Sequence, residues 1–246
     1  MSFNGRYELK YFIPYEVAED LIKAVMPHVM PDAHAHIEGD GVPRYTIRSV
    51  YFENYARKCY HEKIDGMRDR RKLRIRAYVQ PGPDDIVFFE IKNRANLQVI
   101  KERSSMPLRH VAALLDGALR LNELALPLAP HKAAERFLHF RTMFGLEPIV
   151  SVIYERTPFV GREDESVRLT LDVNLRAEDQ RDADCLFALR PSHPVPLPGA
   201  ILELKFDWLM PEWMRQVVRQ FDLRQESISK YCHCVDAVVF KEFEVR

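Results

Sequence analysis

Three basic residues share one face of a predicted strand near the middle of the first half of the chain. In the segment RRKLRIRAYV (70–79), Lys72, Arg74 and Arg76 alternate with apolar residues. Successive side chains of a β-strand point to opposite faces of the sheet, so the three cations would lie side by side. A single strand of this kind is most often a solvated surface, and a binding function requires the pattern to recur.

The same alternation of charged and apolar residues is present in other segments. The charged positions are Glu8 and Lys10, Arg44 and Arg48, Glu90, Lys92 and Arg94, Lys101 and Arg103, Arg168, Asp172 and Arg176, and Glu203 and Lys205. Because the residues between them are largely apolar, we expect the opposite faces of these strands to pack under helices. Arginine is frequent at the charged positions, and its planar fork suits bidentate contact with phosphate oxygens.

Closing this sheet into a barrel would turn the charged faces inward. A barrel of about eight strands has side chains filling its lumen and no exposed edges. A lumen lined by cations is destabilised by their repulsion unless a polyanion neutralises them, so it predicts an anionic ligand. The few acids, Glu90, Asp172 and Glu203, predict a divalent cation as well, because Mg²⁺ commonly combines one or two carboxylates with substrate phosphates.

Periodicity and turn residues locate the elements that must position these charges. Besides a first strand at Glu8 and Lys10, we predict strands at 44–54, 70–79, 85–94, 99–108, 147–160, 166–177 and 199–207. We predict helices at 13–29, within 109–144 and at 211–224, and loops at 33–42 and about 178–199. No break in composition marks a boundary. We therefore expect one α+β domain over residues 1–246, a closed antiparallel β-barrel of about eight strands with helices packed outside.

Composition excludes several classes of protein. Lys+Arg and Asp+Glu balance at 36 each, which argues against a generic nucleic-acid binder. No stretch approaches 18 apolar residues and the first residues contain no apolar signal core, so we expect a chain that does not span a membrane. Four cysteines in 246 residues fit a reducing cytoplasm better than a disulfide framework. The CHC sequence at 232–234 is only a weak metal motif.

The chain resembles a known family, the VTC-type polyphosphate polymerase domain of the CYTH-like triphosphate tunnel metalloenzymes. The matching stretches are KYFI (10–13), SVYFEN (49–54), KLRIRAY (72–78), FFEIKNR (88–94), IKERSSMPL (100–108), PIVSVIYERTPF (148–159), VRLTLD (167–172), AILELKF (200–206), PEWM (211–214) and SISKY (227–231). The resemblance implies an eight-stranded tunnel that binds ATP and inorganic polyphosphate with Mn²⁺ or Mg²⁺. It also implies transfer of the γ-phosphoryl group of ATP to a growing polyphosphate chain.

The resemblance and the alternating positions together define the expected site residues. As catalytic cations we expect Lys10, Arg74, Arg76, Lys92, Arg156, Arg168 and Lys230. As substrate contacts we expect Lys63, Lys101, Arg48, Tyr154, Lys205 and Ser229. As the metal ligand we expect Glu203, with Glu8 and Asp172 as weaker candidates.

Two other functions remain open on the same fold. Hydrolytic tunnel enzymes often begin with two glutamates in E-x-E-x-K, whereas this chain has Arg6 at the first of these positions. The change weakens a second metal site and favours a polymerase, as does a tunnel open at both ends. The alternatives are a triphosphate or polyphosphate hydrolase and a non-catalytic module that binds polyphosphate or inositol phosphates. Eukaryotic relatives carry a fused membrane segment, so we expect a cytoplasmic chain that reaches a membrane only through a separate partner.

Several of these residues also have ordinary structural explanations. Asp172 is as suited to orienting an arginine as to binding metal, and Tyr154 as suited to packing as to touching phosphate. Glu203 could instead form a surface pair with Lys205. We expect Trp208 and Trp213 to anchor the last helix to the barrel.

Overall fold

The computed structural model describes residues 6–37, 42–95, 98–124, 131–183 and 185–240. Its strands are β1 (Arg6–Ile13), β2 (Val29–Pro31), β3 (His36–Ile37), β4 (Pro43–Glu53), β5 (Arg70–Tyr78), β6 (Ile86–Ala95), β7 (Gln98–Pro107), β8 (Glu147–Gly161), β9 (Arg168–Asp179), β10 (His193–Pro194) and β11 (Ala200–Phe206). Its α-helices are α1 (Tyr15–Val25), α2 (Lys58–Ile64), α3 (Val111–Asp116), α4 (Lys132–Phe144), α5 (Glu212–Gln220) and α6 (Lys230–Val235). Two short 3₁₀ turns, Leu108–His110 and Leu121–Glu123, and a π-helical turn, Asp236–Phe240, complete the elements.

The long strands form a closed antiparallel barrel, as predicted. Their order is β9-β11-β1-β7-β6-β5-β4-β8, and β8 pairs with β9 to close the ring. All of these pairings are antiparallel, and the short strands β2, β3 and β10 extend β8, β4 and β9. Closure leaves the barrel strands without exposed edges and gives each of them an inner and an outer face.

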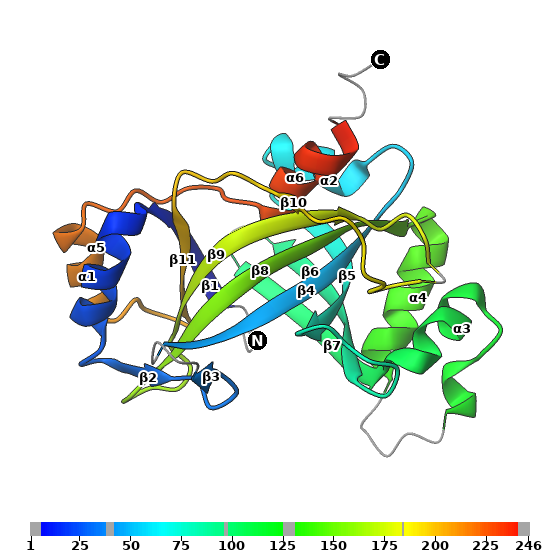
Figure 1. The fold of residues 1–246 in the computed structure, drawn as a ribbon, viewed down its shortest axis with the longest axis horizontal. Helices are drawn as coiled ribbons and strands as arrows, with labels where there is room; N and C mark the ends of the chain where they lie inside the picture. Colours follow the sequence, from blue (N-terminus) through cyan, green and yellow to red (C-terminus); the bar gives the residue numbers. More distant parts are fainter. Residues whose placement is uncertain (1–5, 38–41, 96–97, 125–130, 184, 241–246) are drawn as a thin grey trace.

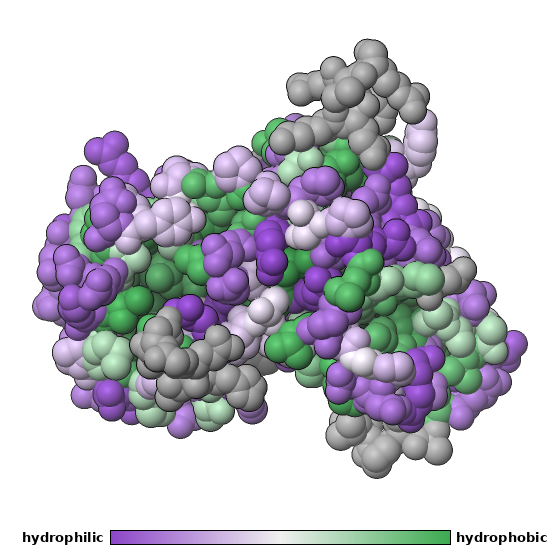
Figure 2. All heavy atoms as spheres, in the orientation of Figure 1, coloured by the Kyte–Doolittle hydropathy of each residue, from purple (hydrophilic) through white to green (hydrophobic). Residues whose placement is uncertain are grey.

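Two groups of helices cover apolar outer faces of the barrel (Figure 1). Helices α3 and α4 pack on β4, β5 and β6, where Phe137 contacts Phe52 and Phe89 edge to face. Helices α1 and α5 pack on β1, β9 and β11 around Leu21 and Met214. The alternating apolar residues of the strands therefore face the helices, as their pattern predicts. On the face shown in Figure 2, the outer side of the α1–α5 layer is mostly hydrophilic.

The helices predicted from the sequence are present but shorter than their patterns. The segment 109–144 contains α3 and α4, each of which ends before a glycine with positive φ, Gly117 at 82° and Gly145 at 58°. Glycine adopts this left-handed conformation at little cost, which explains both helix ends. Helix α2 was not predicted, because its seven residues do not form a clear apolar stripe.

The two tryptophans differ in their surroundings. Trp213 packs in the α1–α5 layer and stacks on His28, with ring centroids 5.2 Å apart, as expected of an anchor. Trp208 was expected to do the same, but 76% of its surface is exposed. It follows the end of β11 in a loop, where no helix covers it. No helix among the described residues is long and apolar enough to cross a membrane.

One buried carboxylate holds α2 and α6 at the same end of the barrel. Glu53, at the end of β4, accepts hydrogen bonds from the backbone N–H groups of Asn54, Cys59 and Tyr60, and from the Tyr231 hydroxyl at 2.7 Å. Only 3% of Glu53 is exposed, and its hydrogen bonds from Cys59 and Tyr231 are buried, so these two donors have little access to water. Removing the carboxylate would leave them buried without an acceptor.

A Glu53→Ala variant should therefore lower the free energy of unfolding by about 1–3 kcal/mol, the cost of leaving buried donors unsatisfied. Urea denaturation followed by circular dichroism measures this change. The exposed Glu165 provides a control, and Glu165→Ala should change stability by less than about 0.5 kcal/mol. Equal stabilities of the two variants would contradict the structural role given to Glu53.

Candidate functional site

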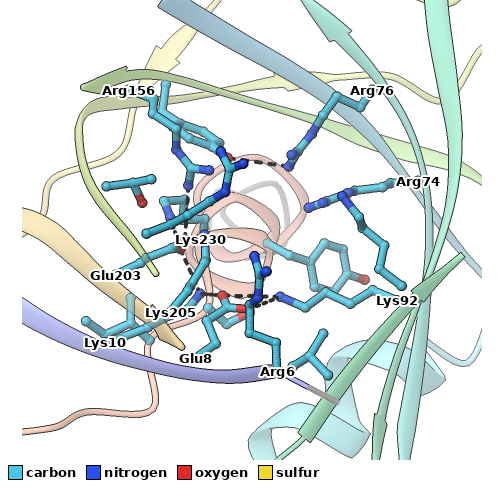
Figure 3. Close-up of a pocket in the computed structure, with 18 of the residues that line it drawn as sticks. Arg6, Glu8, Lys10, Arg74, Arg76, Lys92, Arg156, Glu203, Lys205 and Lys230 are labelled. Atoms are coloured by element: carbon cyan, nitrogen blue, oxygen red, sulfur yellow. Dashed lines mark hydrogen bonds and ion pairs between the residues drawn. The ribbon is translucent and has the colours of Figure 1, made fainter. Parts of the chain in front are cut away.

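The inner faces of the strands enclose one large cavity of about 1450 Å³. It brings together most of the residues predicted from the sequence. From the first half of the chain these are Glu8, Lys10, Lys63, Arg74, Arg76, Lys92 and Lys101. From the second half they are Tyr154, Arg156, Arg168, Glu203, Lys205, Ser229 and Lys230. Figure 3 shows many of these side chains converging from several strands and from α6.

Glu203 is the centre of one cationic cluster in this cavity. Its carboxylate lies 3.1 Å from Lys10 Nζ, 2.7 Å from both Lys205 Nζ and Lys230 Nζ, and 3.0 Å from Arg156 Nη2. Burial alone would raise the pKa of Glu203, but these four cations hold it well below its ordinary value. Glu203 is therefore ionised across the physiological pH range, and it holds four positive side chains in fixed positions.

Glu8 lies beside this cluster on the neighbouring strand. It is 3.0 Å from Lys92 Nζ and 3.4 Å from Lys10 Nζ. In the β1–β11 register Lys10 lies opposite Glu203 and Glu8 lies opposite Lys205, so acids and bases alternate across the two strands. The ammonium group of Lys10 thus bridges the carboxylates of Glu8 and Glu203.

Asp172 does not line the cavity, which corrects its candidate role as a metal ligand. Both of its oxygens accept hydrogen bonds from Arg156, each at 2.7 Å, and Lys230 Nζ lies 2.5 Å away. The carboxylate is 1% exposed. Asp172 therefore orients Arg156 and Lys230 from behind, and its oxygens are already occupied.

A second cationic cluster surrounds Glu90 on the opposite wall. Arg74 Nε and Arg103 Nε each donate to its carboxylate at 2.7 Å, and Lys101 Nζ lies 3.4 Å away. Arg74 also donates to the hydroxyl of Tyr51 at 2.8 Å. Burial alone would raise the pKa of Tyr51, but the nearby cations, led by Arg74, lower it to about 8. The contact of Tyr51 with Arg74 was missed because the sequence of β4 carries no signal of which residues the fold brings beside this tyrosine.

The sequence predicted a lumen lined by cations that repel one another, but in the structure many of the lumenal cations are paired with a carboxylate. Glu8, Glu90, Asp172 and Glu203 each contact at least two basic side chains. These contacts offset much of the repulsion expected in the empty barrel. The residual charge of the cavity is still positive, because its basic residues outnumber its acidic ones.

Arg48 lies outside the cavity, which corrects its predicted contact with substrate. In β4, Ser49 pairs with Arg76 and Tyr51 pairs with Arg74, so the odd-numbered residues face the lumen. Arg48 pairs with Ala77 and points outward, where it forms a bidentate contact with Glu178, both distances being 3.0 Å. The sequence could not show which parity faced inward, because both faces of β4 contain polar residues.

Residues at the cavity rim are paired to acids in neighbouring loops or strand ends. Arg168 donates to Asp32 at 2.7 Å, and Arg6 donates to Asp207 at 3.0 Å. Arg6 thus lies at the rim, and this position of β1 supplies no carboxylate to the lumen. The exposed Trp208 also lines this part of the cavity.

Helix α6 lies across one end of the barrel (Figure 3). Lys230 reaches Asp172 and Glu203, and the ring of Tyr231 packs against Tyr51 with centroids 4.9 Å apart. Ser229, at the start of the helix, also lines the cavity. The expected passage open at both ends is therefore obstructed by α6 in this structure.

The acidic residues fit a divalent ion only in combination with a ligand. In the described part of the chain, no group of three His, Cys, Asp or Glu residues is arranged to hold a metal ion. Glu203 and Glu8 are the carboxylates that line the cavity near each other, bridged by Lys10. Two carboxylates completed by phosphate oxygens match the preference of Mg²⁺ and Mn²⁺ for oxygen ligands.

Asp172 provides a test of the paired-charge arrangement. Burial would raise its pKa, but Arg156 and Lys230 reverse this effect and lower it. Its contribution to stability is therefore present above the unfolded pKa of about 3.9 and lost as the pH falls through the lower folded value. Asp172→Asn should destabilise the protein by about 3–5 kcal/mol at pH 7, because it leaves buried cations underpaired.

Urea unfolding at pH 7 and at pH 3.5 measures this difference, and urea is preferred because guanidinium salt would screen the charges. The difference in the free energy of unfolding between wild type and Asp172→Asn should be smaller at pH 3.5 than at pH 7. The control Asp179→Asn removes a half-exposed acid and should have a small effect at both pH values. A gap that is independent of pH would show that the charge of Asp172 is not what stabilises the site.

Comparison with known proteins agrees with the fold. Among solved structures, a putative adenylate cyclase from Bacillus halodurans is similar in fold, with a TM-score of 0.50 and 16% identity, covering 92% of this chain and 95% of that one. Among curated proteins, subunit 4 of the vacuolar transporter chaperone complex from Trypanosoma cruzi and from Trypanosoma brucei brucei are each 26% identical over 211 residues. These matches cover 71% of this chain, which spans about a quarter of the length of the relatives.

The family comparison covers almost all of the barrel and its helices. The VTC domain pattern matches residues 5–239, from the start of β1 to the turn that follows α6. This range includes every lumenal residue described above. The chain therefore belongs to the VTC domain family.

Proposed function

We propose that this domain is a metal-dependent polyphosphate polymerase, which transfers the γ-phosphoryl group of ATP to the end of an inorganic polyphosphate chain. The observation that carries the proposal is the convergence of lysines and arginines from seven of the eight barrel strands and from α6 on one cavity. A cavity of about 1450 Å³ accommodates a triphosphate together with several further phosphate units. Repeated fixed cations suit a linear polyanion whose units are identical.

The two carboxylate clusters support this proposal because they hold the cations in place before a ligand binds. Phosphoryl transfer requires little covalent chemistry from the protein and depends on positioning and charge neutralisation. Arg156 is held by Asp172 and Arg74 by Glu90, so neither guanidinium must reorganise when phosphate arrives. Preorganised donors of this kind stabilise the charge that spreads over the transferred group.

The reaction proposed is an in-line displacement. An oxygen of the terminal phosphate of the chain attacks the γ-phosphorus of ATP, and the bond from that phosphorus to the β–γ bridging oxygen breaks. The bond electrons leave with the bridging oxygen of ADP, and the chain is longer by one phosphate. Lys10, Lys92 and Arg74 line the cavity where they can contact the phosphate oxygens throughout this step.

The metal proposal rests on Glu203 and Glu8. These residues would hold Mn²⁺ or Mg²⁺ together with phosphate oxygens of the ligand. When bound, such an ion supplies charge neutralisation to the leaving diphosphate. The lysines around Glu203 would then share its carboxylate with the metal ion, and their ammonium groups would be able to contact phosphate.

The names of the relatives suggest where such an activity would operate. Subunit 4 of a vacuolar transporter chaperone complex is, by its name, part of an assembly concerned with transport. We extend this to the present chain as a proposal that it acts on the cytoplasmic side of a membrane with a separate membrane partner.

A triphosphate hydrolase is the second candidate, and the position of α6 favours it. An obstructed end suits a ligand that enters and leaves by one mouth, whereas a growing chain needs room to extend. Against it, Arg6 stands at the position of the first glutamate in the E-x-E-x-K pattern of hydrolytic tunnel enzymes, and it pairs with Asp207. A non-catalytic phosphate-binding module is the third candidate, because the cations suffice for binding without turnover.

Analysis of the reaction products distinguishes the three candidate functions. The protein is incubated with ATP and Mn²⁺, and the products are resolved on a gel and by ADP and orthophosphate assays. ADP with a lengthening phosphate ladder supports the polymerase, and free orthophosphate without a ladder supports the hydrolase. Tight binding of ATP without turnover would leave only the binding module.

Arg74 tests phosphate binding separately from turnover. Arg74→Ala should weaken inorganic tripolyphosphate binding about ten- to a hundredfold, because a charge-assisted contact contributes about 1.5–3 kcal/mol. Isothermal titration calorimetry measures the change. Arg71 is a matched control on the same strand, since it faces outward over the ring of Phe140, and Arg71→Ala should bind within about twofold of wild type. A loss of stability with unchanged affinity for tripolyphosphate would show that Arg74 has a structural role.

Glu203 tests the metal. Glu203→Gln keeps the side-chain shape but removes the charge, so a metal ion would lose its main protein ligand. Turnover should fall at least about a hundredfold, in line with losing a main electrostatic contribution to the transition state, while tripolyphosphate binds within a few fold of wild type. The control Glu102→Gln alters an outward-facing acid paired with Arg136 and should retain activity. Wild-type turnover in Glu203→Gln would remove this residue from the mechanism.

A further inference from the structure

Lys72 occupies an unusual place among the lumenal lysines. It lies on β5 and lines the cavity at the end covered by α6. Its Nζ donates to Ser229 Oγ at 3.3 Å and lies 4.2 Å from the ring centroid of Tyr231. The partners of this ammonium group are therefore a hydroxyl and an aromatic face, both neutral.

The strand register places Lys72 in a row of like charges. Lys72 lies opposite Lys92 on β6, and Lys92 lies opposite Lys101 on β7. Lys92 has Glu8 at 3.0 Å and Lys101 has Glu90 at 3.4 Å. For Lys72, no carboxylate lies within 4.0 Å among the residues that the structure describes. Directly opposed like charges are unfavourable, so this row is only partly compensated in the empty cavity.

The surroundings of Lys72 disfavour its charged form. Burial lowers its pKa to about 8, since the nearby thiols of Cys232 and Cys59 and the hydroxyl of Tyr51 only partly oppose the effect. Lys92 acts in the same direction as burial. The groups that face it from β4, β6, α2 and α6 thus supply no fixed negative charge.

Ser229 has a hydrogen left to donate beside this lysine. Its Oγ accepts from Lys72 Nζ and from the backbone N–H of Cys232. A hydroxyl accepts two such bonds and donates one, so its own hydrogen is available to a ligand in the cavity. An ammonium and a hydroxyl group side by side are suited to one tetrahedral anion.

We propose that Lys72 Nζ and the hydroxyl of Ser229 together bind a phosphoryl group at the α6 end of the cavity. The inference rests on the proposed function and extends it, because it adds a phosphate subsite outside the clusters of Glu203 and Glu90. The phosphoryl group is the terminal one of a nucleoside triphosphate or a unit of inorganic polyphosphate. Either would supply the negative charge that Lys72 lacks.

The proposal predicts that phosphate binding takes up a proton above pH 8. A bound anion raises the pKa of Lys72 above its value of about 8 in the empty protein. Below pH 8 the lysine is already charged and the affinity does not depend on this group. Above pH 8 it must first be protonated, so its contribution to affinity falls about tenfold for each further pH unit.

Calorimetry with inorganic tripolyphosphate at pH 7 and pH 9 tests this. Lys72→Met should weaken binding at pH 7 about ten- to a hundredfold, the effect of one charge-assisted contact. It should also reduce the loss of affinity between pH 7 and pH 9 by about tenfold relative to wild type. Lys72→Arg keeps the charge at both pH values, so it should restore binding and remove the same part of the pH dependence.

Lys101→Met is the matched comparison. Lys101 also lines the cavity and its pKa is lowered to about 8, chiefly by burial, but it already has Glu90 as a partner. Its loss should weaken tripolyphosphate binding less than the loss of Lys72, and the contribution of Lys72 to the pH dependence should persist. Any pH dependence left in Lys72→Met then reports the other titrating groups of the cavity, Lys101 and Tyr51 among them, and the ligand itself.

The outcomes separate this inference from the proposed function. If wild type binds tripolyphosphate and Lys72→Met binds equally well with the same pH dependence, the subsite is wrong and the proposed function stands. If wild type binds neither tripolyphosphate nor ATP, the proposed function is wrong, and the phosphate subsite that rests on it is wrong as well. Weaker binding of both ligands in Lys72→Met, restored in Lys72→Arg, assigns the contact to the nucleotide, and weaker binding of tripolyphosphate alone assigns it to the chain. If circular dichroism shows that Lys72→Met is unfolded, Lys72→Arg decides: a pH dependence smaller than that of wild type by about tenfold between pH 7 and pH 9 supports the subsite, and an unchanged pH dependence contradicts it.

Discussion

The structure depends on pairing buried cations with a small number of buried carboxylates. An isolated charge in a barrel lumen costs several kcal/mol in lost hydration, and neighbouring cations add repulsion. Glu90 and Glu203 each hold several basic side chains, and Asp172 holds Arg156 in a bidentate contact from behind the cavity wall. These contacts allow one cavity to remain strongly basic without a ligand.

The same pairing connects parts of the chain that are far apart in sequence. Glu203 on β11 is contacted by Lys10 from β1, Arg156 from β8 and Lys230 from α6. Closure of the barrel brings β1, β8 and β11 to one lumen, and Lys230 secures α6 across its end. Ordering these charges is thus coupled to forming the barrel, so the site is complete only in the folded chain.

Carboxylates in the cavity, or in its wall as Glu90 is, would also limit how tightly the cavity can hold the proposed phosphate ligand. Each lysine or arginine that contacts Glu8 or Glu90 must share its charge with any ligand. In the proposed reaction, this competition would lower affinity and favour release of product, while the fixed geometry would be retained for the transition state. A lumen with full, unshared charges would bind a polyanion more tightly and release it more slowly.

The sequence alone determined the barrel and most of its lining, whereas the pairing of charges was decided by tertiary structure. Period-two alternation in 70–79 and 166–177 identifies strands with one charged face, because that pattern depends only on backbone geometry. It does not show which parity of β4 faces inward, and Arg48 was wrongly placed in the lumen for this reason. Nor does it show that α6 lies across one end, that Asp172 stands behind Arg156, or that Trp208 is exposed. Those features depend on which strands become neighbours and on their register, and contacts between different elements, such as Arg156 with Asp172 or Arg48 with Glu178, leave no local pattern in a single sequence.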